Sequence, residues 1–344
     1  MAEAPGSAAS AGTRWAGRAR DVGIRAGGLA IAILLVIIVF TLLSKPNTFL
    51  SLPNALVIMR YMSTIAIVAL GLTLVIVVGE IDLSFGYMYG LAATLISVSW
   101  IMWGWPIWAS IALAFAAAIL VGAVNALLVT LVNIPSFIVT LGTGQLIFGV
   151  TLLVSGTQTL NPAYPPDGYT VPQDQIDWFF GLANQHLPFG IPMQGLWMIG
   201  VAVVIGFILS RSLFGFRLKA IGGNPAAAQL ARLPIVKYKF VAFMGCAVLA
   251  SLASMLDFAF IGSTQPNLGI SLVFPVFAAV IIGGASLSGG RGTAIGTLSG
   301  ALLLAIIQDG LALLSVGAYL QQFVQGTVTI AAVVLDRFTA GLRK

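Results

Sequence analysis

Residues 55–86 read ALVIMRYMSTIAIVALGLTLVIVVGEIDLSFG, an apolar run over 55–78 followed directly by a short polar motif. A helix needs about 20 mainly apolar residues to cross the hydrocarbon core of a membrane. The run is therefore long enough for one crossing. Similar runs recur along the rest of the chain, so the sequence predicts an all-α protein that crosses a membrane many times.

The composition of the 344-residue chain supports this fold class. Hydrophobic residues make up 59% of the chain and charged residues only 8%, whereas a soluble protein carries about 25% charged residues. An ordinary soluble enzyme, a disordered protein and a disulfide scaffold are thereby excluded. The net charge of +6 indicates no nucleic-acid partner, because the basic residues do not gather on one soluble patch. The single cysteine, Cys246, is expected to be a small packing residue.

We expect about ten transmembrane helices, which together form a membrane domain over residues 29–338. A disordered tail (1–28) precedes this domain, and a short tail (339–344) follows it. The run at 272–284 is too short to cross alone, and the nearby Pro275 predicts a broken or re-entrant helix. Such backbone is tolerated at membrane depth only where protein or a watery cavity satisfies its polar groups. The apolar runs lie at 29–43, 55–78, 82–101, 107–131, 136–154, 196–210, 239–261, 272–284, 293–314 and 319–335.

The distribution of Lys and Arg predicts the orientation, because basic residues are retained on the cytoplasmic side. Placing the N-terminus inside leaves only Lys45 and Arg60, of 16 basic residues, at the outer side. The loop 155–195 is then external, and it carries three aspartates and no basic residue. The loop 211–238 is cytoplasmic. Both termini are expected in the cytoplasm.

The polar motif at the end of the first quoted run occurs twice. Residues 74–86 (LVIVVGEIDLSFG) and residues 278–290 (AAVIIGGASLSGG) align with an offset of 204. Each is an apolar run that continues into G-x-x-x-L-S-x-G. Both copies end a span at the cytoplasmic side, which predicts a parallel repeat related by an axis along the membrane normal.

The cytoplasmic loop contains the stretch AIGGNPAAAQLA at 220–231. Asn224 can cap a short helix with Pro225 at its first position, and the alanines that follow favour a helix with small side chains. Pro234 ends it. Such a helix suits docking into a groove of another protein. A basic topology anchor with no further role is the alternative.

Polar residues in or beside the spans are candidates for a solute pathway, because ionisable groups are costly in lipid. Asp257, in the span 239–261, is a further ionisable residue of this kind. The amides among them are able to bond a polyhydroxylated solute or, equally, one helix to another. No metal-ligand cluster, catalytic triad or Walker A sequence is evident, so no enzyme activity, metal or nucleotide site is expected. The pathway candidates are Glu80, Asp82, Asn125, Gln265, Asn267 and Asp309.

Four sequence blocks, in their order and spacing, resemble the permease subunits of ribose-type ABC sugar importers. They are GEIDLSFG (79–86), NIPSFIVTLGT (133–143), AIGGNPAAAQLA (220–231) and AVIIGGASLSGGRGTAIGT (279–297). The resemblance implies the permease subunit of an ATP-driven monosaccharide importer in a bacterial cytoplasmic membrane. It also implies a second permease copy, cytoplasmic ABC ATPase subunits that bind ATP and Mg, and a periplasmic or lipid-anchored sugar-binding protein.

The same resemblance assigns ATPase coupling to the loop 211–238. The family often has Gly where this chain has Glu80, and its loop corresponding to 155–195 is usually shorter. An ABC permease for nucleosides is an alternative. So is an ion-coupled secondary transporter, which would need essential membrane acids such as Asp82 or Asp309. The implied coupling residues are Gly222, Gly223, Asn224, Pro225, Ala227, Ala228, Ala231 and Arg232.

Overall fold

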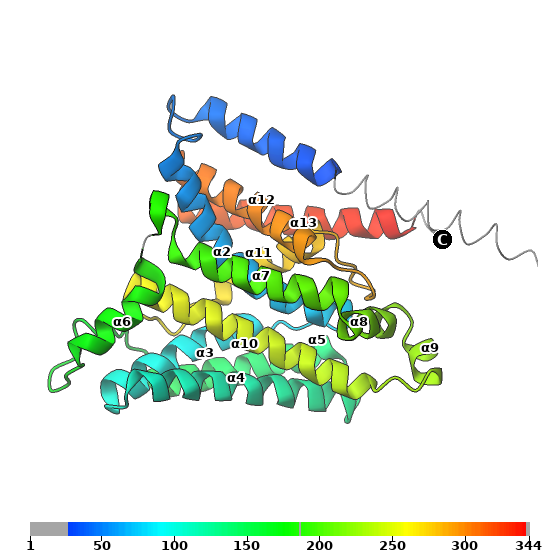
Figure 1. Ribbon diagram of the computed structural model, residues 1–344, viewed down its shortest axis with the longest axis horizontal. Coiled ribbons are helices and arrows are strands. Elements are labelled where there is room, and N and C mark those ends of the chain that lie inside the picture. Colours follow the sequence, from blue (N-terminus) through cyan, green and yellow to red (C-terminus); the bar gives the residue numbers. More distant parts are fainter. Residues whose placement is uncertain (1–26, 186, 342–344) are drawn as a thin grey trace, which may run out of the picture.

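The structure is a computed structural model that describes residues 27–185 and 187–341, and all regular elements in these residues are helices. Figure 1 shows the long helices lying side by side. The predicted all-α class is confirmed. The tails 1–28 and 339–344 lie mostly outside the described residues, although positions 27, 28 and 339–341 continue the adjoining helices. The helices are Gly27–Leu43, α2 (Leu52–Val77), α3 (Phe85–Ser97, continued by a π-helical turn Val98–Met102), α4 (Ile107–Thr130), α5 (Ser136–Ser155), α6 (Gln173–Asn184), α7 (Met193–Arg211), α8 (Leu213–Gly223), α9 (Pro225–Leu230), α10 (Ile235–Ile261), α11 (Val273–Ile282), α12 (Ala294–Leu313) and α13 (Ala318–Gly341).

The helices reproduce the predicted multi-pass architecture. Seven of those described are long and apolar enough to cross a membrane, namely α2, α3 with its π-helical turn, α4, α5, α7, α10 and α12. The other three predicted runs correspond to the helix Gly27–Leu43, to the short segment Ile270–Ile282 and to α13. Large apolar side chains cover the outside of the bundle, as Leu153 on α5 does at 84% exposure. A continuous surface of this kind fits lipid better than water.

Helices α2 and α10 lie at the centre of the bundle. α10 packs against α2, α3, α4 and α6, and α2 also packs against α7, α11 and α12. Every residue from Ile65 to Val77 is buried, so this half of α2 is surrounded by protein on all sides. Cys246 on α10 is fully buried and packs against the backbone at Gly71, as expected of a small packing residue.

α11 is the broken helix that the sequence predicts at 272–284. Its ten residues follow a 3₁₀ turn, Ile270–Leu272, and end at Gly283. A helix of this length is about 15 Å long, roughly half of the hydrocarbon core. Pro275 occupies its third position, within the first turn, where proline is tolerated. The loop 283–293 then leads to α12.

The two copies of the repeat end their helices in the same way, with the Schellman hydrogen-bond pattern and a glycine in the left-handed conformation. Gly79 has a φ of 91° and Gly284 a φ of 89°. The structural offset is therefore 205, and the sequence alignment at 204 was wrong by one residue at this point. The reason is that the left-handed backbone, and not the motif letters, decides which glycines are equivalent. The amide-to-carbonyl pairs are Gly79–Ile76 and Glu80–Val75 in the first copy, and Gly284–Ile281 and Ala285–Val280 in the second.

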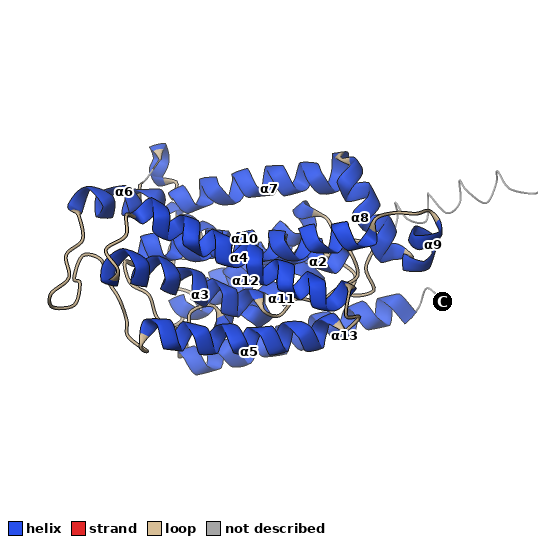
Figure 2. Cartoon of the chain, turned by 90° about the horizontal axis from the view of Figure 1, so that it is seen from below, coloured by secondary structure: helices blue, strands red, loops and turns tan. Residues whose placement is uncertain are grey.

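The segment 155–195, predicted as a loop, contains the helix α6. It buries Ile176, Phe179 and Ala183 against the bundle. An antiparallel bridge between Leu160 and Thr264 holds the start of the segment to the connection that follows α10. Figures 1 and 2 both place α6 at the opposite end of the molecule from α8 and α9. The molecule therefore presents two different polar ends, separated by the length of the bundle.

Candidate functional site

Residues 211–238, predicted to couple to an ATPase and named the coupling segment for that prediction, comprise α8, α9 and their connections, with the last residue of α7 and the first four of α10. Asn224 joins the two helices: its side-chain oxygen accepts a hydrogen bond from the Ala227 amide at 3.0 Å. Pro225 is the first residue of α9. The predicted cap and the predicted short helix are both present. α9 ends at Leu230, and Arg232 then adopts a positive φ of 55°, which turns the chain toward α10.

Most of the predicted coupling residues are exposed. Gly223, Asn224, Pro225, Ala227, Ala231 and Arg232 are exposed, whereas Gly222 and Ala228 are buried. The large apolar side chain of Leu230 is 87% exposed at the end of α9. Small side chains around one protruding leucine form a surface that another protein can approach closely. The two buried residues face this chain instead.

Two basic side chains hold the coupling segment to the bundle. The Lys219 ammonium donates to the carbonyl oxygen of Leu209 at 2.8 Å, at the end of α7. Burial lowers the pKa of Lys219 below its ordinary value. Lys239, in the first turns of α10, forms an ion pair with Glu80 in the loop after α2. The segment is therefore attached both before and after α9.

Asp82 and Asn125 belong to one buried network. Asp82 Oδ1 accepts from the amide of Ser84 at 2.8 Å and from its hydroxyl at 2.6 Å. Asn125 donates to the Ser84 hydroxyl oxygen at 2.8 Å and accepts from Thr143 at 2.7 Å. Among the described residues Asp82 Oδ2 meets no donor in hydrogen-bond geometry, although the Cys246 thiol lies nearby. The network joins the loop after α2 to α4 and α5.

Asp309 lies in a different helix contact. It is 3% exposed, and its Oδ2 atom accepts from the Asn54 side chain at 2.9 Å, which joins α12 to α2. Asp257, on α10, accepts from the hydroxyl of Tyr89 and, at 2.7 Å, from that of Thr64. Each of these acids thus bonds helix to helix.

The six pathway candidates do not converge on one site. Glu80 is close in sequence to the Asp82 network but points to Lys239. Gln265 and Asn267 are exposed in the connection between α10 and α11. This connection lies at the same end as α6, because Thr264 pairs with Leu160. Within the described residues no three His, Cys, Asp or Glu side chains lie close enough to share a metal ion.

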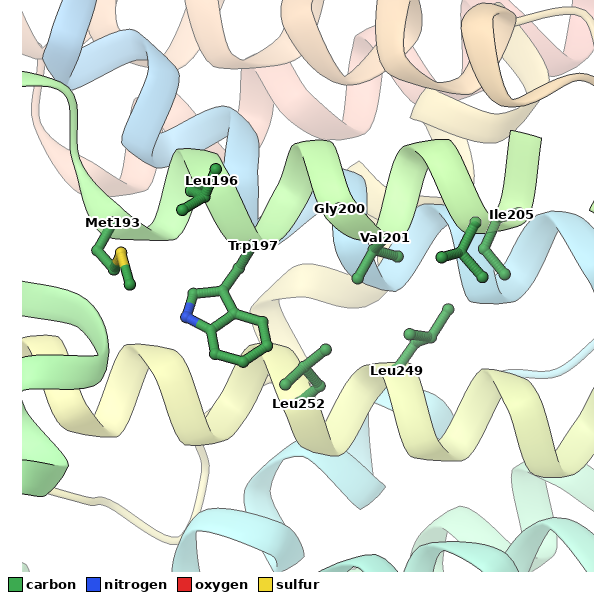
Figure 3. Close-up of a pocket in the computed structure, with 9 residues that line it drawn as sticks. Met193, Leu196, Trp197, Gly200, Val201, Ile205, Leu249 and Leu252 are labelled. Atoms are coloured by element: carbon green, nitrogen blue, oxygen red, sulfur yellow. The ribbon is translucent and has the colours of Figure 1, made fainter. Parts of the chain in front are cut away.

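A cavity of about 460 Å³ lies between α7 and α10 (Figure 3). Trp197 of α7 projects toward Leu252 of α10, and the remaining lining is also apolar. The Trp197 indole N–H is already bonded to the Leu182 carbonyl at 3.1 Å. None of the pathway candidates lines this cavity. Because its walls offer almost no hydrogen-bonding groups, it does not suit a polyhydroxylated solute.

The sequence prediction missed Lys239 as the partner of Glu80. A signal was available, because the predicted orientation places these two opposite charges at the cytoplasmic ends of the spans 55–78 and 239–261. It also missed Tyr89 and Thr64 as partners of Asp257. Hydroxyl groups inside apolar runs are common, and their pairing depends on how the helices are rotated against one another.

Comparison with known proteins gives matches over nearly the whole membrane domain. Residues 54–333 match the family described as the permease component of the branched-chain amino acid transport system. The ribose import permease protein RbsC of Escherichia coli K12 is 36% identical over 308 residues, or 89% of this chain and 92% of that protein. RbsC of Bacillus subtilis 168 is 32% identical over 310 residues, 90% of this chain and 92% of that protein. The autoinducer 2 import system permease protein LsrD of Klebsiella pneumoniae is 32% identical over 270 residues, which are 78% of this chain and 79% of that protein.

Proposed function

Because this chain belongs to the family of permease components of the branched-chain amino acid transport system, we propose that it is the membrane-spanning permease subunit of an ATP-driven ABC importer for a monosaccharide. The observation that carries this is the 36% identity to a ribose import permease over 89% of the chain. A second ribose permease, from Bacillus subtilis, matches over 90% of the chain. These relatives favour a sugar over a branched-chain amino acid or a nucleoside.

The permease domain in this proposal is residues 29–338, with both termini in the cytoplasm of a bacterium. The coupling segment docks on separate ABC ATPase subunits, which bind ATP and Mg. The capped helix α9, its exposed small side chains and its two attachments to the bundle support this role. ATP binding closes the ATPase subunits, and the docked segment moves the membrane helices. ATP can drive this step only if its affinity differs between the two states.

The sugar enters at the end that carries α6. A periplasmic or lipid-anchored binding protein delivers it there, against the segment 155–195. The exposed amides of Gln265 and Asn267 lie at this end and suit hydrogen bonds to sugar hydroxyls. A second copy of the chain completes the pore. Since the binding protein supplies selection, the pore needs only weak affinity, and strong binding would slow release.

The buried pathway candidates hold moving helices together. Asp82 and Asn125 link the loop after α2 to α4 and α5, and Asp309 links α12 to α2. Glu80, at the cytoplasmic end of the same loop, ties that loop to α10 through its ion pair with Lys239. The pathway therefore consists of exposed amides where the sugar enters and of polar helix contacts that shift as access alternates.

The test is uptake of radiolabelled ribose into proteoliposomes that contain this chain, with the ATPase and the binding protein each added or omitted. We expect uptake only with both partners and ATP, and competition by other monosaccharides but not by nucleosides. Uptake by the chain alone, driven by an ion gradient and abolished by an uncoupler while ATP remains, would establish a secondary transporter instead.

Asp309 separates these two mechanisms further. We expect Asp309→Asn to keep ATP-driven uptake within about twofold, because the new side-chain oxygen still accepts the Asn54 hydrogen bond. An ion-coupled transporter that uses this acid would lose uptake. Asp309→Leu is the control: it removes one of the two acceptors of Asn54 Nδ2, which keeps only the Phe49 carbonyl at 3.0 Å. It should lower the free energy of unfolding by about 1–3 kcal/mol.

A further inference from the structure

Three segments far apart in the sequence meet at the coupling segment: the end of α8, which belongs to it, the loop after α2 (the first repeat loop) and the loop after α11 (the second repeat loop). The amide of Gly290 donates to the carbonyl oxygen of Val77 at 2.9 Å, so the second repeat loop is bound to the end of α2. Gly222 packs against these same two groups. A methyl group on Gly222 would lie 1.9 Å from the Val77 oxygen and 2.7 Å from the Gly290 nitrogen.

The second repeat loop is in turn close to the Gly222 carbonyl and to the first repeat loop. A methyl group on Gly289 would lie 2.6 Å from the Gly222 carbonyl oxygen and 2.8 Å from the Cα atom of Gly79. Gly79, Gly289 and Gly290 all have a φ between 75° and 91°, a conformation that glycine adopts without strain. We call Gly79, Gly222, Gly289 and Gly290 the glycine contact.

The glycine contact joins backbone to backbone, with no side chain between the segments. A displacement of α8 therefore cannot be absorbed by a change of rotamer. The ion pair between Glu80 and Lys239 ties the first repeat loop to α10, immediately after the coupling segment. Coupling between distant parts of a protein travels through contiguous contacts of this kind. Both repeat loops are thus attached to one movable segment.

We infer that Gly222 is a positioning residue for transport: through it, movement of the coupling segment passes at once to both repeat loops, and from them into α3 and α12. This inference rests on the proposed function of the segment. It gives Gly222 a role different from that of its exposed neighbours, because Gly222 is buried and touches this chain. The exposed residues of the coupling segment receive the motion of the ATPase, and the glycine contact passes it to both repeat loops.

The test compares Gly222→Ala with Gly149→Ala. Both positions are helical glycines, but a methyl group on Gly149, in α5, would meet no described atom within 4 Å. Each variant is assembled with the ATPase and the binding protein in proteoliposomes, and ribose uptake and ATP hydrolysis are measured together. We expect Gly222→Ala to lower uptake about tenfold while ATP hydrolysis stays within about twofold, so that more ATP is used per sugar. Gly149→Ala should match the wild type in both measurements.

An unchanged ratio of ATP to sugar in Gly222→Ala overturns the inference, and so does release of the ATPase from that variant on size-exclusion chromatography. If Gly222→Ala does not fold, Gly79→Ala takes its place. Its methyl group would clear Gly222 at 3.6 Å, but alanine is strained at a φ of 91°, so the substitution shifts the loop after α2 within the glycine contact. A wild-type ratio in Gly79→Ala then overturns the inference. Wild-type vesicles without ATP-driven uptake would instead refute the proposed function, on which the inference rests.

Discussion

Glu80 illustrates how a single side chain holds two parts of this protein together. It follows the left-handed Gly79 at the end of α2, and its amide donates to the Val75 carbonyl at 3.0 Å to close the Schellman turn. Its carboxylate pairs with Lys239 at the start of α10. Because both side chains are partly exposed, solvent weakens the attraction, and the pair contributes about 1 kcal/mol or less to stability. The main effect of the pair is to hold the loop after α2 in place against α10.

Reversal of one charge tests the pair. In Glu80→Lys two ammonium groups face each other, so we expect a lower melting temperature in detergent and slower ribose uptake. In the double variant Glu80→Lys with Lys239→Glu the attraction returns in the opposite sense. We expect it to recover at least half of both losses, which corresponds to a coupling energy of about 1 kcal/mol.

The control uses a lysine on the same turn. Lys237 is exposed two residues before Lys239, so Glu80→Lys with Lys237→Glu should recover neither property. Equal recovery by both double variants would show that only the net charge of this end matters. The sequence identified Glu80 as an unusual charge and placed Lys239 at the same end of the molecule. Which of the basic residues at this end pairs with Glu80 depends on how α2 and α10 pack.

At the scale of helices, α4 approaches α10 through a face of small residues. Ala114, Ala118 and Gly122 are buried at intervals of four residues along α4. A methyl group on Gly122 would lie 2.5 Å from the Cα atom of Met244 on α10. Small residues at this spacing let two membrane helices come close enough for backbone contact.

We expect Gly122→Val to separate α4 from α10 and to lower the free energy of unfolding by about 1–3 kcal/mol, as overpacking does. Gly142→Val, in the middle of α5, is the matched control, because a methyl group there would meet no described atom within 4 Å. Both changes replace a helical glycine by valine, so helix propensity is the same in each. Thermal unfolding in detergent, followed by fluorescence, gives the comparison. Equal melting temperatures would contradict close packing at Gly122.

The helices were largely predictable because apolar runs of sufficient length report membrane crossings. α6 was not predicted, since its apolar residues are diluted by Gln, Asp and Asn. Their positions, Ile176, Phe179 and Ala183, nevertheless follow the period of a helix that buries one side. The repeat was found, but its offset at the helix ends was wrong, because Gly283 and Gly284 are indistinguishable as letters. Only the backbone angle shows that Gly284 is the equivalent of Gly79.

At the scale of the whole molecule, the two polar ends must face opposite sides of the membrane. Tyr164, near α6, is 82% exposed and Leu230, on the coupling segment, is 87% exposed. Lys and Arg gather at the end that carries Leu230, and this predicts that it lies in the cytoplasm. Cys246 is fully buried, so a background with Cys246→Ser removes the native thiol with little effect on the surface.

In this background we expect Tyr164→Cys to react with a membrane-impermeant maleimide on intact spheroplasts. Leu230→Cys should react only after the membrane is opened. The Cys246→Ser parent, with no other change, should stay unlabelled under both conditions. The reverse order of labelling would overturn the predicted orientation. The sequence could predict which end is which, but not the shape of either end, because that depends on contacts such as the bridge from Leu160 to Thr264.

The hydrogen bond between Gly290 and Val77 has a consequence for the synthesis of the protein on the ribosome. Its two partners stand 213 positions apart in the chain. At a synthesis rate of about 5–20 residues per second, Gly290 is added to the chain roughly 10–40 s after Val77. A nascent chain can therefore insert α2, and even form α9, before the loop that carries Gly290 has been synthesised.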